Sequence, residues 1–174
     1  MDILLVIDMQ NDFVKETLNT KEALEIVDKL KEKIENFEGQ VIYTLDTHDK
    51  NYLQSQEGRN LPIKHCIKNT WGHEIIDEFK ACKNFNHGKF FEKNTFGSKD
   101  LVKYLVDLDK KEDIGKIYFT GVCTDICVVS NALLIKAFLP EIELLIYKDL
   151  CAGLNKEKHK AALDVLDSCQ VYAI

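Results

Sequence analysis

Two cysteines stand four residues apart in the segment Gly121–Leu134, which reads GVCTDICVVSNALL. The segment follows an apolar run and opens a helical pattern, so we expect Thr124 to be the N-cap of a helix that holds Cys127 in its first turn. Unpaired N–H groups and the helix dipole at that end stabilise a thiolate and lower its pKa. The spacing therefore favours Cys127 as a nucleophile and Cys123 as part of the turn.

Other interpretations of this pair stay open at this stage. Free cysteine is among the most buried residue types, so both thiols could be ordinary core. They could also form a redox pair. A metal site is a weaker alternative, because C-x-x-x-C is not the usual zinc-ribbon spacing and no second pair completes it.

A nucleophilic thiol needs a proton acceptor, and Asp8 is placed to be one. Asp8 ends the apolar run ILLVID, where burial would raise its pKa toward the working range of a base. Lys93, in FFEKNTFGS, follows another predicted strand and could stabilise the thiolate while orienting the carboxylate. The alternatives are an aspartate that caps a loop and a lysine at the surface.

A candidate metal site follows the second predicted strand. Asp46 and His48 are two residues apart, so both point the same way in an extended chain. Glu57 and His65 follow in the same long loop. Two imidazoles and a carboxylate suit zinc, iron or manganese and leave coordination positions open, although a polar loop with surface histidines is the plainer alternative.

Short β-rich runs alternate with helical patterns along the whole chain. The predicted strands are Ile3–Asp8, Val41–Leu45, Lys89–Glu92, Ile117–Thr120, Leu144–Tyr147 and Val171–Ile174. The predicted helices are Lys21–Phe37 with Leu24 on its inward face, Gly72–Cys82, Ser98 to about Asp109, Asp125–Leu139 and Lys156–Ser168. Continuous apolar strands separated by helices indicate a three-layer α/β/α fold with a mostly parallel, roughly six-stranded central sheet. In such a sheet the site lies at the carboxyl ends of the strands, where Thr47–Thr70 also begins as a long irregular stretch.

Three segments carry a family resemblance that spans nearly the whole chain. IDMQNDFV, EKNTFGS and GVCTDICV resemble the three signature blocks of the isochorismatase-like cysteine hydrolases. The resemblance implies one domain over residues 1–174 and a catalytic triad of Asp8, Lys93 and Cys127. Cys127 would attack an amide carbonyl and form a thioester, with Asp8 moving the proton. The backbone N–H groups of Cys123 and Cys127 would hold the oxyanion, beside a cis peptide bond between Val122 and Cys123.

The loop after the second strand narrows the resemblance to the nicotinamidase branch. D-x-H, an E-G pair and a P-x-x-H-C segment are similar to that branch, whereas members acting on isochorismate or carbamoylated amines generally lack the metal site. The resemblance implies nicotinamide as substrate in NAD salvage, Phe13 and Phe96 as candidate walls for its ring, and one divalent ion. That ion would be zinc, with iron or manganese as alternatives. Its ligands would be Asp46, His48 and His65, and Glu57 would reach the ion through water. Two alternatives are another small amide as substrate, and a non-catalytic or thiol-redox module.

Bulk composition restricts the partners. The formal net charge of −6 and the scattered lysines argue against nucleic acid and anionic membranes as partners. The chain has no apolar run long enough for a membrane span and no signal-peptide pattern, so we expect a cytoplasmic protein. Its six cysteines are expected to be reduced, because a chain of 174 residues can build a core without disulfides. A homo-oligomer and the roles of Cys66, Cys82, Cys151 and Cys169 stay open.

Overall fold

The computed structural model describes all 174 residues and contains one six-stranded sheet. Its strands are all parallel and lie in the order β3-β2-β1-β4-β5-β6. They are β1 (Ile3–Ile7), β2 (Gln40–Asp46), β3 (Lys89–Lys93), β4 (Lys116–Val122), β5 (Glu143–Ala152) and β6 (Val171–Ala173). Each predicted strand is present, and β5 continues well beyond the predicted Tyr147 because its second half pairs with the end of β4.

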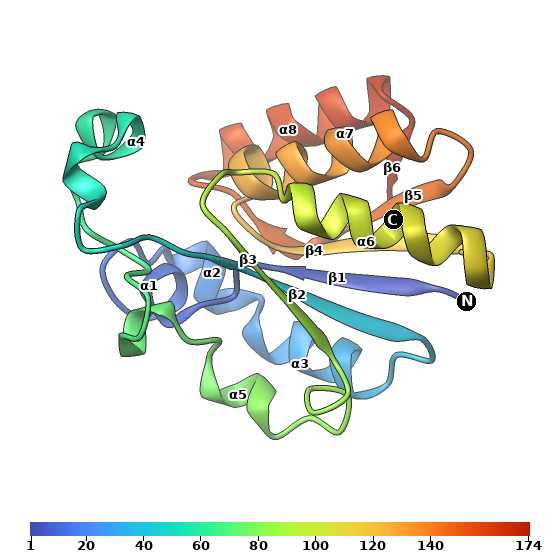
Figure 1. Cartoon of the computed structure of the whole chain (residues 1–174), viewed down its shortest axis with the longest axis horizontal. Helices are drawn as coiled ribbons and strands as arrows, with labels where there is room; N and C mark the ends of the chain where they lie inside the picture. Colours follow the sequence, from blue (N-terminus) through green and yellow to red (C-terminus); the bar gives the residue numbers. More distant parts are fainter.

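Helices cover both faces of the sheet (Figure 1). One face carries α6 (Lys99–Glu112), α7 (Val129–Phe138) and α8 (Lys156–Ser168), and the other carries α1 (Asn11–Val14), α2 (Lys21–Glu25), α3 (Val27–Glu35) and α5 (Asp77–Lys80). Alternate residues of β1 belong to two separate apolar cores, one under each helical layer. This two-sided burial explains the continuous apolar run of β1 and confirms the three-layer α/β/α prediction.

Two helix predictions were wrong in detail. The pattern over Lys21–Phe37 forms two helices that meet at Ile26, and Leu24 is 57% exposed instead of inward-facing. The pattern over Gly72–Cys82 forms the 3-10 turn η2 (Trp71–His73) and the short α5. The chain between them is extended, because Ile75 pairs with Gln10 and the Ile76 N–H donates to the Met9 carbonyl at 3.1 Å.

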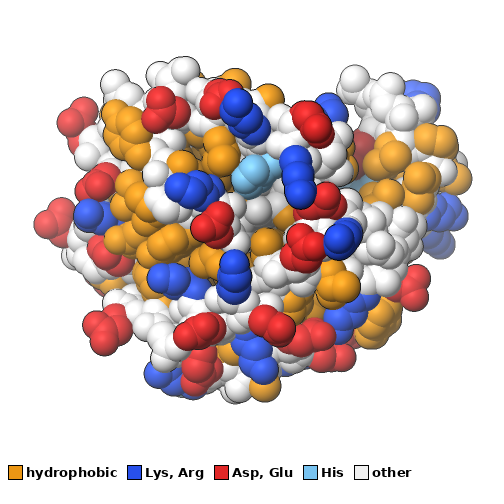
Figure 2. Space-filling model, turned by 180° about the vertical axis from the view of Figure 1, so that it is seen from behind, with side chains coloured by type: hydrophobic (Ala, Val, Ile, Leu, Met, Phe, Trp, Pro, Cys, Tyr) orange, Lys and Arg blue, Asp and Glu red, His pale blue; other side chains and the backbone are white.

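The irregular stretch after β2 projects from the body as an arm. It contains the 3-10 turn η1 (Tyr52–Gln54) and the helix α4 (Gln56–Asn60), which stands apart at the upper left of Figure 1. Figure 2, which shows the molecule from behind, has a notch between this arm and the rest of the surface. Within the arm, Gly58 packs directly against the backbone of Tyr52: a Cβ at Gly58 would lie 2.1 Å from the Tyr52 carbonyl oxygen.

None of the helices has both the length and the apolar character that a membrane crossing requires.

Strand register assembles the candidate site at the carboxyl edge of the sheet. Asp46 and Lys93 are direct partners in the parallel pair of β2 and β3. Ile7, the residue before Asp8, pairs with Gly121 at the end of β4. Residues distant in the sequence therefore meet because parallel strands end at the same edge.

Gly121 gives a stability prediction, because it combines a left-handed φ of 104° with close contact to β1. A Cβ there would lie 2.1 Å from the Ile7 carbonyl oxygen. We expect Gly121→Ala to lower the free energy of unfolding by about 3 kcal/mol or more, measured by urea denaturation. Gly115→Ala is the control, since its added Cβ would crowd a side-chain oxygen of Asp2, while the Met1 carbonyl oxygen would lie at an ordinary 3.8 Å. Equal losses in the two variants would contradict this account of Gly121.

Candidate active site and metal centre

Lys93 lies at the centre of the first group of candidate residues. Its side chain is 1% exposed, and Nζ lies 2.6 Å from Asp8 Oδ2. The same Nζ lies 3.4 Å from Cys127 Sγ and 3.6 Å from Asp46 Oδ1. The structure thus brings together an ammonium, a thiol and two carboxylates from four separate segments.

Hydrogen bonds to Thr44 of the neighbouring strand β2 hold Asp8 in place. It follows β1 with a φ of 49°, which turns the chain out of the sheet at this point. Its N–H donates to the Thr44 carbonyl oxygen at 3.2 Å, and the Thr44 hydroxyl donates to Asp8 Oδ1 at 2.6 Å. One carboxylate oxygen is therefore fixed by Thr44, while the other faces Lys93.

Burial dominates the protonation states of this group. It raises the pKa of Cys127 well above the usual range, and the charge of Asp8 raises it further, although Lys93 acts in the opposite direction. Burial also raises the pKa of Asp8 despite Lys93 beside it. For Lys93, burial works against the charged form, but Asp8, Cys127 and Asp46 outweigh it and raise the pKa. The expected lowering of the Cys127 pKa was therefore wrong, because burial and the charge of Asp8 raise it.

The turn that carries Cys127 also differs from the prediction. The chain enters a π-helical turn, η3 (Thr124–Val128), before α7 begins, and Cys123 instead of Thr124 occupies the N-cap position. The Cys123 carbonyl accepts the N–H groups of Ile126 at 3.0 Å and Val128 at 3.1 Å. The Thr124 hydroxyl is hydrogen-bonded to His159 Nδ1 on α8 at 2.8 Å, so it is not free to cap. The peptide bond between Val122 and Cys123 is cis, as the resemblance implied.

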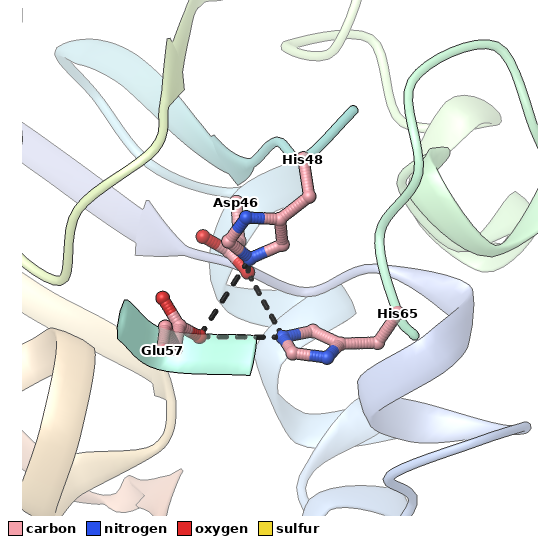
Figure 3. Close-up of side chains that lie close together, drawn as sticks. All are labelled: Asp46, His48, Glu57 and His65. Carbon is pink, nitrogen blue, oxygen red and sulfur yellow. Dashed lines mark hydrogen bonds and ion pairs between the residues drawn. The ribbon is translucent and has the colours of Figure 1, made fainter. Parts of the chain in front are cut away.

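Four side chains from the end of β2 and from the arm converge on one another (Figure 3), namely Asp46, His48, Glu57 and His65. His48 Nε2 lies 2.8 Å from Asp46 Oδ2, and His65 Nε2 lies 3.4 Å from the same oxygen. Glu57 Oε1 lies 3.7 Å from Nε2 of both histidines. One donor atom from each of the four residues lies within 4.8 Å of the others.

This donor set fits a divalent ion. Bonds of about 2.0–2.2 Å to nitrogen and oxygen place tetrahedral ligands roughly 3.3 Å apart, close to the separations seen here. Burial raises the pKa of Glu57, and Asp46 raises it further, because two carboxylates share the cluster. Burial also raises the pKa of Asp46, but hydrogen bonds from His48 and His65 outweigh it and lower that pKa. A cation at the centre would relieve the repulsion between the two carboxylates.

Three further residues position this cluster, and sequence reasoning missed all of them. Gln10 accepts the Asp46 N–H at 2.8 Å and donates to the Asp46 carbonyl at 2.8 Å. Asp12 accepts the N–H of Cys66, the residue after His65, at 2.7 Å. Tyr52 packs its ring against the imidazoles of both metal-cluster histidines. Gln10 and Asp12 belong to the IDMQNDFV segment, so their place in that block was the signal available.

One cavity of about 1210 Å³ is lined both by Cys127 and by the cluster of Asp46, His48, Glu57 and His65. Its lining includes Cys127 and Cys123 on one side and all four cluster residues on the other. Phe13 and Phe96 also line it, and the Phe13 ring lies 5.6 Å from that of His65. A small flat molecule in this cavity could reach the thiol and the cluster together.

Comparisons with known proteins agree with this geometry. A family model described as the isochorismatase domain matches residues 2–174. The chain is 30% identical to the protein named uncharacterized isochorismatase family protein PncA of Bacillus subtilis, and the alignment covers 92% of this chain and 91% of that protein.

Two solved structures extend the comparison over nearly the entire chain. The pyrazinamidase of Pyrococcus horikoshii in complex with zinc has a TM-score of 0.82 at 25% identity, covering 99% of this chain and 98% of that one. The nicotinamidase/pyrazinamidase PncA from Bacillus subtilis has a TM-score of 0.79 at 27% identity, with the same coverage of 99% and 98%. Because the family model spans all three motif segments and every strand of the sheet, the chain belongs to the isochorismatase family.

Proposed function

We propose that this chain, as one domain over residues 1–174, is a metal-dependent nicotinamidase that hydrolyses nicotinamide to nicotinate and ammonia in NAD salvage. The observation that carries the proposal is one cavity lined by both Cys127 and the cluster of Asp46, His48, Glu57 and His65. Relatives named nicotinamidase and pyrazinamidase support it, and so does the zinc named with one of them.

The proposed reaction uses a small number of protein groups. Asp8 accepts the proton of Cys127 as the sulfur attacks the amide carbonyl carbon and pushes its electron pair onto oxygen. The backbone N–H groups of Cys123 and Cys127 hold this oxyanion. Asp8 then passes the proton to the departing ammonia, leaving a thioester on Cys127. Asp8 next takes a proton from water as the water oxygen attacks the thioester carbon. The C–S bond then breaks, nicotinate is released, and Asp8 returns the proton to sulfur to restore the thiol.

Lys93 has a positioning and electrostatic role in this scheme. Its contacts to Asp8 at 2.6 Å and Cys127 at 3.4 Å keep base and nucleophile together. Its positive charge stabilises the thiolate that forms only when the proton moves. The raised pKa of Cys127 suits this order of events, because the thiol stays protonated until substrate is bound.

Asp46, His48 and His65 would hold one divalent ion, zinc in the first place, with Glu57 nearby and able to act through water. When bound, such an ion supplies a Lewis acid for the pyridine nitrogen, which orients the ring and withdraws electrons from it. Phe13 and Phe96 would flank the ring, because aromatic side chains pack well against a flat heterocycle.

An ammonia-release assay tests the proposed function. Purified protein is incubated with nicotinamide after metal removal and again after zinc, iron or manganese is returned. We expect release that depends on the returned metal, and no release from nicotinate, which has no amide. Protein that never releases ammonia from nicotinamide with any of these ions would refute the proposal.

The size of the cavity favours a second candidate within the same chemistry. A volume of about 1210 Å³ lies above the usual range for small-ligand pockets, roughly 300–1,000 Å³. A larger amide could therefore be the preferred substrate. The same assay with ring-substituted pyridine carboxamides separates the two, since a much higher kcat/KM for a larger amide would favour the second candidate.

The raised pKa of Asp8 predicts the acid limb of the pH profile. Asp8 accepts a proton only when it is ionised, so activity is lost as pH falls through its pKa. Burial raises this pKa, so we expect kcat/KM to decline at a higher pH than an ordinary aspartate would give. The measurement is kcat/KM against pH, with bound metal and circular dichroism recorded at each point. Full activity down to the ordinary aspartate range would contradict Asp8 as the base.

A further inference from the structure

Asn131 is a fully buried polar residue on α7, one helical turn after Cys127, and the proposed reaction does not use it. Its amide nitrogen donates to the Cys127 carbonyl at 2.8 Å and to the Phe96 carbonyl at 3.0 Å. Its amide oxygen accepts the Ser98 N–H at 2.9 Å. One side chain therefore ties the turn that carries the thiol to the segment that follows β3.

Ser98 is fixed as the N-cap of α6, where its side chain accepts the Leu101 N–H, but residues 94–97 have few other hydrogen bonds. The segment over residues 94–98 follows Lys93 at the end of β3 and reaches α6 at Lys99. Phe96 is 47% exposed and lines the cavity, so its own packing does not anchor it. Gly97 lies against α7, because a Cβ there would be 3.2 Å from the Ser130 carbonyl oxygen. The backbone of this segment thus rests on α7, where Asn131 bonds to Phe96 in its middle and to Ser98 at its end.

We infer that Asn131 is a positioning residue that holds Phe96 at the cavity wall and thereby sets affinity for the aromatic ring of the substrate. The inference rests on the proposed function only for the identity of that ring. Lys93 does not depend on Asn131, since it pairs with Asp46 inside the sheet. Loss of Asn131 should therefore weaken ring binding more than it slows the chemical steps.

Asn131→Ala tests the inference, and Asn84→Ala is a matched control. Asn84 also donates its amide nitrogen to two carbonyls, those of Ile34 at 2.7 Å and Phe37 at 3.1 Å. None of these three residues lines the cavity. We expect KM for nicotinamide to rise about tenfold in Asn131→Ala, with kcat changing less than about threefold. Asn84→Ala should leave KM within about twofold of wild type, even where it lowers stability.

A double-mutant cycle shows whether Asn131 acts through Phe96. Phe96→Ala should raise KM by itself, and adding Asn131→Ala to that variant should raise it no further. Additive effects of the two changes on KM would overturn the inference. If Asn131→Ala does not fold, Asn131→Ser keeps one hydroxyl donor on a shorter side chain, and we expect it to give a smaller rise in KM.

Amide hydrogen exchange gives a readout that needs no turnover. Peptides covering residues 94–98 should exchange at least about fivefold faster in Asn131→Ala than in wild type, and at the wild-type rate in Asn84→Ala. Unchanged exchange in this segment would overturn the inference, whether or not the protein hydrolyses nicotinamide. A wild-type protein without activity on nicotinamide would refute the proposed function alone.

Discussion

Replacing Cys127 with alanine is expected to lower kcat for ammonia release from nicotinamide by about 10⁴-fold or more, because Cys127 supplies the cavity thiol that contacts Lys93. Binding of the ring should remain within a few-fold of wild type, since the proposed metal ligands and the cavity-lining Phe13 and Phe96 are unchanged. The measurements are single-turnover ammonia release and calorimetric titration with nicotinamide, both in the presence of metal.

Cys82→Ala is the matched control for this variant. Cys82 is also a buried free cysteine, but it packs in the core beneath α3 and α5, away from the cavity. Its replacement should cost stability without lowering kcat. Near-wild-type turnover by Cys127→Ala would eliminate the thioester pathway, and an equal loss in both variants would point to unfolding as the cause.

The residues of the candidate site could be predicted because strand order constrains where they lie. Asp8, Lys93 and Asp46 each stand at or just after the end of an apolar strand, and parallel strands end at one edge of the sheet. The side-by-side register of Asp46 and Lys93 could not be read from sequence. It depends on which strands become neighbours, and that is decided by packing across the entire sheet.

The errors have a common physical origin in tertiary context. Thr124 has the right side chain for an N-cap, but His159 from a distant helix binds its hydroxyl. The position of Cys127 at a helix start argued for a lowered pKa, whereas burial and the charge of Asp8 raise the pKa. Leu24 fits the apolar period of Lys21–Phe37, yet the break at Ile26 turns it outward. Local pattern gives no information about partners contributed by other segments.

The positioning residues were missed for a related reason. Gln10, Asp12 and Asn131 are buried polar side chains whose partners lie far away in the sequence. A polar residue in an otherwise apolar segment signals that such a partner exists, because burial without one is costly. It does not show which distant group the partner is.

Replacing His65 with alanine is expected to weaken binding of a divalent ion by about 100-fold or more, and to lower kcat/KM in parallel. His65 contributes one of two imidazole nitrogens to the cluster, and its Nε2 lies 3.4 Å from Asp46 Oδ2. Without it, Asp46, His48 and the half-buried Glu57 remain, and two of these three are carboxylates that bind zinc less selectively. Affinity is measured by competition with a chromophoric chelator, and bound metal by elemental analysis after dialysis.

His73→Ala supplies the control, because His73 is equally buried beside β2 but is not part of the cluster. Its imidazole is hydrogen-bonded to the Thr47 hydroxyl at 2.8 Å, so its loss should affect stability and leave metal affinity near wild type.

Iodoacetamide labelling of Cys127 in metal-free wild type tests whether the thiol depends on the metal cluster. Lys93 contacts Asp46 through Oδ1, whereas the histidines contact Oδ2. The rate at which Cys127 is alkylated should therefore be the same with and without metal, although turnover stops when the metal is removed. Nicotinamide hydrolysis that continues at the full rate in His65→Ala or after chelation would show that the cluster serves no catalytic ion.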